Sequence, residues 1–120
     1  MKFRRGEINI LCSNLEASLH FYVDILGFTP TTDAEGFYHL QFAGNQYLLL
    51  PIAARVDNPA PYGSVPQFSM DLLADDLGAA YAYFKARGVT FAKEWTEGAA
   101  MFVIRDPDGL PWEVVAFGID

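Results

Sequence analysis

The stretch SNLEASLHFYVDILGF, residues 13–28, decides the fold because a similar stretch, DDLGAAYAYFKARGVTF, follows at residues 75–91. With Leu15 aligned to Leu77, small and aromatic residues of the two stretches fall at matching positions. Each stretch has apolar residues at helical spacing, so each predicts an amphipathic helix. The chain therefore contains an internal duplication built around two helices.

Both predicted helices have start and stop signals in the sequence. Ser13 and Glu16 have the spacing of a capping box at the start of the first helix. Gly27 and Gly88 follow the two apolar patterns, and glycine readily adopts the left-handed backbone that ends a helix. We therefore expect two helices of similar build.

Strand patterns surround each predicted helix. EINILC, residues 7–12, alternates so that Glu7 and Asn9 lie on the face opposite the apolar side chains. The other strand-like segments are QFSMDLL, FYHLQF, QYLLL, AMFVIR and WEVVAF, with less visible ones in TPTTDAE and TFAKEW. The order is β-α-β-β-β twice, which predicts an α+β fold of two βαβββ modules. A ferredoxin-like domain is the alternative, but it has four main strands rather than eight.

At 120 residues the chain has the length of one domain. We expect the first module at residues 1–52 and the second at residues 67–120. Between them, residues 53–66 contain three of the seven prolines and no periodicity, which is typical of a linker.

Composition excludes several classes of protein. Eight Lys and Arg against fifteen Asp and Glu give a net charge of −7, which argues against a nucleic-acid partner. The longest apolar run, YLLLPIAA at residues 47–54, is too short to span a membrane. A single cysteine, Cys12, allows no intrachain disulfide and fits a reducing compartment. We expect a cytoplasmic protein without nucleic-acid or membrane partners.

The segments NLEASLHFYVDILGF, DDLGAAYAYFKARGV and RDPDGLPWEV, in this order and spacing, resemble the vicinal oxygen chelate superfamily. That group includes glyoxalase I, extradiol dioxygenases, and bleomycin- and fosfomycin-resistance proteins. The resemblance covers nearly the whole chain. It implies a glyoxalase/bleomycin-resistance-type fold in which each βαβββ module forms half of an open barrel around a cleft, often in a homodimer.

The resemblance also implies four site positions. In similar proteins a metal, where present, is held by His or Glu on the first and last strands of each module. These positions fall on Glu7, Leu48, Ser69 and Glu113. Leu48 has no donor atom and Ser69 is a weak ligand, whereas catalytic metals generally have three or more protein ligands. We therefore expect no metal cofactor; if a divalent metal binds, Glu7 and Glu113 are its expected ligands.

Other side chains are expected around the same cleft. A shift of register by one or two residues would put Gln67 or Asp71 in place of Ser69. Glu7 and Glu113 are also the candidate acid or base residues, or the groups that meet a cationic ligand. Exposed strand residues are the alternative interpretation for both, as a hydrogen-bonded structural role is for His39. The remaining expected ligand-binding residues are Asn9, Phe37, His39, Tyr62, Phe102 and Phe117.

Two functions follow from this pattern. The first is a metal-independent homodimer that binds a small, partly aromatic or cationic molecule in a cleft, as in sequestration of an antibiotic or toxin. The second is a metal-dependent lyase, isomerase or dioxygenase of the same superfamily. One fold serves both, so the fold alone does not decide whether the protein is an enzyme. A purely structural or regulatory module is a third alternative.

Overall fold

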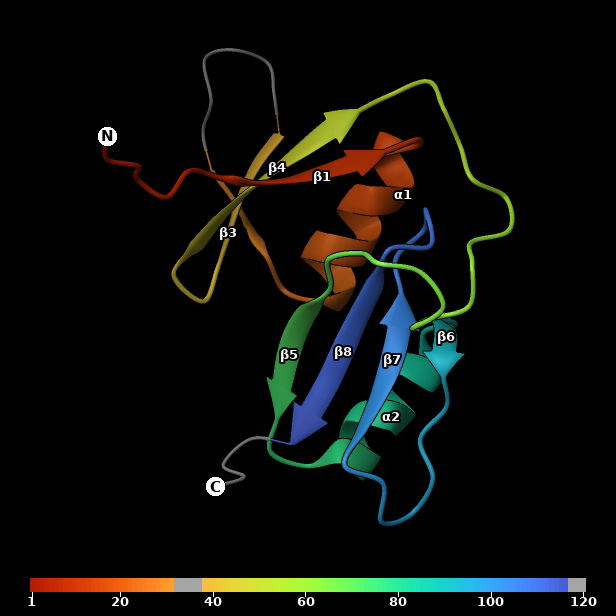
Figure 1. The fold of residues 1–120 in the computed structure, drawn as a ribbon. Helices are drawn as coiled ribbons and strands as arrows, with labels where there is room; N and C mark the ends of the chain where they lie inside the picture. The colour runs from red at the N-terminus through yellow and green to blue at the C-terminus, as the bar shows by residue number, and fades with distance from the viewer. Residues whose placement is uncertain (32–37, 117–120) are drawn as a thin grey trace. The chain divides into compact units, whose positions relative to one another are not determined.

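The computed structural model describes residues 1–31 and 38–116. Within it the chain divides into two compact units, Met1–Arg55 and Val56–Asp120. Each unit contains one helical segment and one four-stranded sheet (Figure 1). Residues 52–69, which connect the two sheets, contain no helix or strand.

The first unit holds the first module. Its elements in chain order are β1 (Ile8–Cys12), α1 (Leu15–Leu19), η1 (His20–Ile25), β2 (Thr29–Pro30), β3 (Tyr38–Phe42) and β4 (Asn45–Pro51). The strand order in the sheet is β1-β4-β3-β2. Strands β1 and β4 are parallel, and the other neighbours are antiparallel.

The second unit repeats this topology. Its elements are β5 (Met70–Ala74), α2 (Leu77–Ala86), β6 (Thr90–Lys93), β7 (Met101–Arg105) and β8 (Pro111–Ala116). The strand order is β5-β8-β7-β6, again with the first and last strands of the module parallel. The predicted α+β fold of two βαβββ modules is confirmed.

The two helical segments begin in the same way. Asn14 and Asp76 are the N-caps, and their side chains accept hydrogen bonds of 3.0 Å from the backbone N–H of Ala17 and Ala79. The predicted capping box placed the cap at Ser13, one residue too early, because Ser and Asn are both good N-cap residues. The predicted left-handed glycines are confirmed, with φ of 85° at Gly27 and 70° at Gly88.

The second half of the first helix departs from the expected α-helix. From His20 to Ile25 the chain forms a π-helix, in which the N–H of Leu26 donates to the carbonyl of Phe21, five residues earlier. The neighbouring side chains of Phe21 and Tyr22 are both buried, at 4% and 0% exposure. The wider turn lets two consecutive large residues face the core, a feature that regular helical spacing does not predict.

Each helix packs on one face of its own sheet, and the core of each module lies between them (Figure 1). Buried apolar residues of the first module are Ile10, Cys12, Phe21, Tyr22, Ile25, Phe28, Leu40, Tyr47 and Leu49. Those of the second module are Leu77, Phe84, Phe102, Val103, Ile104, Trp112 and Val114. The sheet face away from the helix, called the open face below, is where polar strand residues gather.

Candidate functional site

Two of the predicted site residues bind each other in the first module. Glu7 immediately precedes β1, and His39 lies in β3, opposite Leu48 of β4. The Nδ1 atom of His39 lies 2.5 Å from Oε2 of Glu7. Asn9 pairs with the same Leu48 from the other side. Four predicted site residues therefore meet on the open face of the first sheet.

The geometry of this pair gives it defined chemistry. With a proton on Nδ1, the imidazole donates to the carboxylate, which fixes the orientation of the ring. The side chains are 22% exposed for His39 and 37% for Glu7, so solvent and ligands reach both. The pair can exchange hydrogen bonds with a polar ligand. A structural hydrogen-bonding role for His39 is also consistent with this contact.

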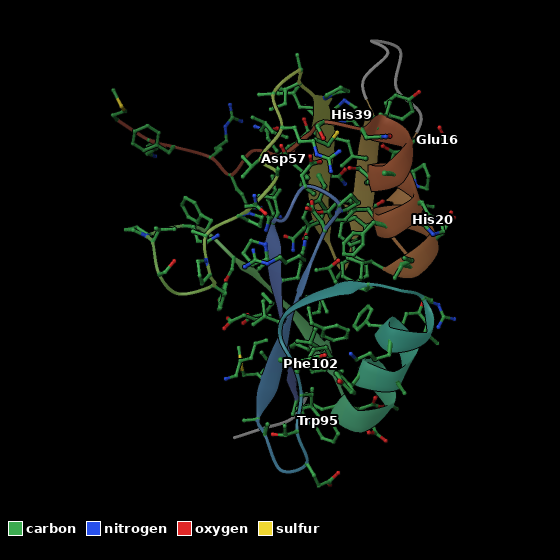
Figure 2. All side chains as sticks on the ribbon, turned by 90° about the vertical axis from the view of Figure 1, so that its right-hand side faces the viewer. Glu16, His20, His39, Asp57, Trp95 and Phe102 are labelled. Atoms are coloured by element: carbon green, nitrogen blue, oxygen red, sulfur yellow. The ribbon has the colours of Figure 1, made fainter. Side chains whose placement is uncertain are left out.

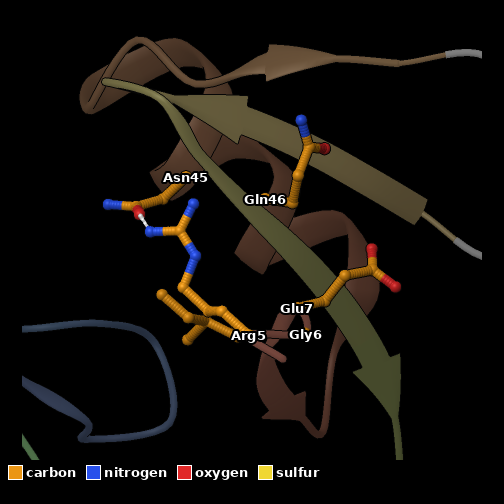
Figure 3. Close-up of a pocket in the computed structure, with 6 residues that line it drawn as sticks. Arg5, Gly6, Glu7, Asn45 and Gln46 are labelled. Carbon is orange, nitrogen blue, oxygen red and sulfur yellow. Dashed lines mark hydrogen bonds between the residues drawn. The ribbon is translucent and has the colours of Figure 1, made fainter. Parts of the chain in front are cut away.

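A small cavity of about 220 Å³ lies beside the pair, at the start of β1. It is lined by Arg5, Gly6, Glu7, Ile8, Asn45 and Gln46. The Nη1 atom of Arg5 donates to Oδ1 of Asn45 at 3.1 Å. Figure 3 shows this bond on one side of β4, with the Glu7 side chain directed to the other side. Arg5 thus attaches the N-terminal segment to the sheet and places a cation at the cavity.

The same amide connects the cavity to the core. Burial raises the pKa of the Tyr47 phenol above its ordinary value of 10.0, and a hydrogen bond with the Asn45 side chain partly offsets this effect. Tyr47 is only 2% exposed and packs against Phe28, with ring centroids 4.7 Å apart. Asn45 therefore links Arg5 on the surface to a buried hydroxyl group.

The open face of the second sheet carries a different set of groups. Glu113 of β8 pairs with Asp71 of β5 on one side and with Val103 of β7 on the other. At the start of β5, the hydroxyl groups of Tyr62 and Ser69 are hydrogen-bonded at 3.1 Å. Two carboxylates on adjacent strands produce a locally negative surface, which suits a cationic group better than an anion.

Equivalence between the modules follows from strand register. Asn9 pairs with Leu48 as Asp71 pairs with Glu113, so Leu48 and Glu113 occupy matching positions in the last strands. Glu7 and Ser69 both directly precede the first residue of a first strand. The equivalence expected from the resemblance is therefore present in the backbone.

The donor sets fit a metal ion poorly. The first module supplies one carboxylate and one imidazole that already bond to each other, and the second supplies two neighbouring carboxylates. In residues 1–31 and 38–116, no three His, Cys, Asp or Glu side chains converge in a way that could hold a metal ion. Catalytic metal sites generally have at least three protein ligands, which neither module provides alone.

One predicted ligand-binding residue lies elsewhere. Phe102 is completely buried and packs on the helix-covered side of its sheet, where its ring contacts those of Tyr81, Phe84 and Phe91. Figure 2 shows Phe102 between the sheet and α2. The prediction that Phe102 lines a cleft is corrected: its neighbour Val103 shares the open face with Glu113.

Phe37 and Phe117, the remaining predicted residues, lie outside the described residues.

The sequence analysis did not identify one contact of the second unit. The guanidinium of Arg105 donates to the carbonyls of Gly109 at 2.8 Å and of Ala60 at 3.2 Å. This contact attaches the connecting segment to the turn before β8. Arg105 gave no signal in the sequence because its partners are backbone atoms.

In the part of the chain that the structure describes, no helix has the length and apolar character needed to cross a membrane.

The sequence model of the Glyoxalase/Bleomycin resistance protein/Dioxygenase superfamily matches residues 4–114. No curated protein matches the chain significantly.

Several solved structures share the fold. A glyoxalase/bleomycin resistance protein/dioxygenase from Alicyclobacillus acidocaldarius is 20% identical with a TM-score of 0.69, covering 96% of this chain and 92% of its own. A lactoylglutathione lyase from Agrobacterium tumefaciens is 25% identical with a TM-score of 0.65 and 97% coverage of both chains. TioX from Micromonospora sp. is 11% identical with a TM-score of 0.63 and 98% coverage of both.

Proposed function

Because the chain belongs to the glyoxalase/bleomycin resistance protein/dioxygenase superfamily, we propose that it binds a small organic molecule on the open faces of its sheets without a metal ion. The observation that carries the proposal is the bond between Glu7 and His39. In this bond the imidazole of His39 engages the carboxylate of Glu7, which the family resemblance implies as a metal-ligand position.

The chemistry of the open faces supports a neutral or cationic ligand with polar groups. The first face supplies the amide of Asn9 and the imidazole–carboxylate pair around the apolar side chain of Leu48. The second supplies Asp71 and Glu113 next to a hydroxyl pair. Apolar surface with a few convergent polar groups is typical of small-molecule sites. Sequestration of an antibiotic or toxin in the cytoplasm is a function consistent with such sites.

We also propose that the protein acts as a homodimer, because dimers are common in this superfamily. The ligand-binding residues under this proposal are Glu7, Asn9, His39, Leu48, Tyr62, Ser69 and Glu113, together with Phe37 and Phe117.

Binding can be tested with benzamidine, a small molecule that joins an aromatic ring to a cation. Amide NMR spectra are recorded while benzamidine is added to the wild-type protein and to Glu7→Gln, which removes the charge but keeps the shape. We expect shifts at Glu7, His39 and Asn9, and at least about tenfold weaker binding in the variant, or about 1.4 kcal/mol. Glu97→Gln, a change at an exposed carboxylate of the second module, is the matched control.

A metal-dependent lyase, isomerase or dioxygenase is the second candidate. The likeness to a lactoylglutathione lyase at 25% identity favours it. Metal analysis after anaerobic purification separates the two. Stoichiometric metal that is lost in a Glu7→Gln, Glu113→Gln double variant would overturn the metal-independent proposal. Metal-free protein that binds benzamidine with the pattern above supports it.

A further inference from the structure

Positive charge in this chain is concentrated at its beginning. Lys2, Arg4 and Arg5 are three of the eight Lys and Arg residues, while residues 6–120 hold five against fifteen Asp and Glu. We call residues 1–6 the N-terminal arm. A short basic segment on an acidic protein is suited to contacts with negatively charged surfaces.

The arm extends away from its own module. Met1 is 107% exposed and Phe3 is 87% exposed, so an aromatic side chain stands in solvent between two cations. Arg5, at the base of the arm, is bonded to Asn45 of β4. Figures 1 and 2 both show the arm leaving β1 on the side away from α1 and η1.

A groove of matching character lies on the outer surface of the first helical segment. It has a volume of about 530 Å³ and is lined by Glu16, Leu19, His20, Val23, Asp24 and Pro30. We call it the helix groove. Figure 2 shows Glu16 and His20 directed away from the sheet. Two carboxylates thus flank the partly buried apolar side chains of Leu19 and Val23.

We propose that the helix groove binds the N-terminal arm of a second copy of this chain, with Phe3 against the apolar side chains and Lys2 and Arg4 beside the carboxylates. An acidic groove with an apolar floor complements a basic segment with one aromatic residue in both charge and polarity. In both views the arm runs away from the helical segment of its own module, so we assign the contact to two copies of the chain.

The dimensions are compatible. Glu16 and Asp24 are eight residues apart, which is at most about 12 Å at the α-helical rise of about 1.5 Å per residue, because the π-helical part η1 rises less. Lys2 and Arg4 are about 7 Å apart in an extended chain. The long Lys and Arg side chains span the difference. Asp24 is bonded to Nδ1 of His20 at 2.9 Å, which holds its carboxylate at the rim of the groove.

This inference specifies a surface for the homodimer proposed above and is independent of the ligand sites. An arm of a few residues buries less than the roughly 1,200 Å² of a stable interface, so the contact is weak alone. Reciprocal exchange of two arms would double it, as in an isologous pair. Because the charges are exposed, association should weaken as salt shortens the Debye length from about 10 Å at 0.1 M to about 3 Å at 1 M.

Charge reversal tests the contact by sedimentation velocity. The arm variant is Lys2→Glu, Arg4→Glu, and the groove variant is Glu16→Lys, Asp24→Lys. We expect each variant alone to dimerise at least about tenfold more weakly than wild type, or about 1.4 kcal/mol. An equimolar mixture of the two should associate again, because the reversed arm complements the reversed groove. Asp75→Lys, Glu97→Lys has the same charge change as the groove variant and should leave association unchanged.

Three outcomes would overturn the inference. If the wild-type protein is a dimer and both variants dimerise equally well, the arm is not part of the dimer interface. Variants that weaken association without recovery in the mixture would show a general effect of charge. Loss of binding to anionic lipid vesicles or RNA in the arm variant, with dimerisation unaffected, would assign the arm to another partner. Circular dichroism confirms that each variant is folded.

Discussion

The two modules share a backbone but differ at matching positions of their open faces. The first carries Glu7 before its first strand, where the second carries Ser69. The second carries Glu113 in its last strand, where the first has Leu48. Residues that face the helices stay apolar in both modules, because they hold helix and sheet together. The duplication thus preserves the core and leaves the open faces to differ in chemistry.

The largest expected difference between the modules concerns Phe102 and its equivalent, Tyr38. Strand register matches the two, since Tyr38 pairs with Leu49 as Phe102 pairs with Val114. Phe102 is 0% exposed and Tyr38 is 44% exposed. We expect Phe102→Ala to lower the free energy of unfolding by about 3–5 kcal/mol, as for other buried aromatic residues. Tyr38→Ala should cost below about 1 kcal/mol.

Urea unfolding followed by circular dichroism measures both free energies. Equal costs for the two substitutions would contradict the difference in burial. A Phe102→Ala variant that is as stable as wild type but binds benzamidine differently would show that Phe102 acts in ligand binding rather than in the core.

The error at Phe102 shows where strand patterns fail. Phe102, Val103 and Ile104 in β7 are each 0% exposed, so this strand is buried on both faces. Alternation of polar and apolar residues identifies a face only when one face meets solvent. Strand β1 alternates in the sequence, and its apolar residues Ile10 and Cys12 are buried while Asn9 and Leu11 are exposed, as the alternation predicts.

Substitutions at the helix N-caps should have the most similar effects on stability in the two modules. Asn14 and Asp76 have nearly the same backbone angles and accept the same 3.0 Å hydrogen bond. We expect Asn14→Ala and Asp76→Ala each to cost about 1 kcal/mol of unfolding free energy, within the usual range of about 0.5–2. Ser13→Ala should cost less than either. A larger loss at Ser13 than at Asn14 would restore the predicted capping box.

Local signals made the helices, the glycine stops and most strands predictable from sequence. The contact between Glu7 and His39 was not predictable, because it joins residues 32 positions apart through two strand pairings. Periodicity shows which face of a strand a side chain occupies but not its neighbour across the sheet. The candidate site was therefore predicted as a set of residues, without its central bond.

A pH dependence should distinguish Tyr47 from its equivalent, Trp112, which does not ionise. Burial raises the pKa of Tyr47 above 10.0. Above pH 10, tyrosine in the unfolded chain loses its proton while Tyr47 in the folded chain still keeps it. The unfolded state gains from this release, so the free energy of unfolding should fall as the pH rises through this window.

Tyr47→Phe has no phenol to ionise and should show a smaller fall in the same window. Unfolding of both proteins in urea at neutral pH and at pH 10–11 measures the difference. The same slope for wild type and variant would contradict a raised pKa at Tyr47.

The smallest expected effect concerns an exposed pair of the second module. Lys85 of α2 donates to Glu94 at 2.6 Å, and the Tyr81 hydroxyl donates to the same carboxylate at 3.0 Å. The bond from Lys85, with a smaller contribution from Tyr81, lowers the pKa of Glu94 below 4.5. In Lys85→Met this pKa should rise toward 4.5 in an NMR titration, whereas Lys93→Met should leave it unchanged.

The lowered pKa of Glu94 stabilises the folded state fully above pH 4.5. This stabilisation is lost as the pH falls below 4.5 and through the pKa of Glu94 in the folded state. Since both groups are exposed, 1 M salt should remove most of the difference in Glu94 pKa between wild type and Lys85→Met. If the pKa of Glu94 is the same in the two proteins at low salt, the pair has no electrostatic role.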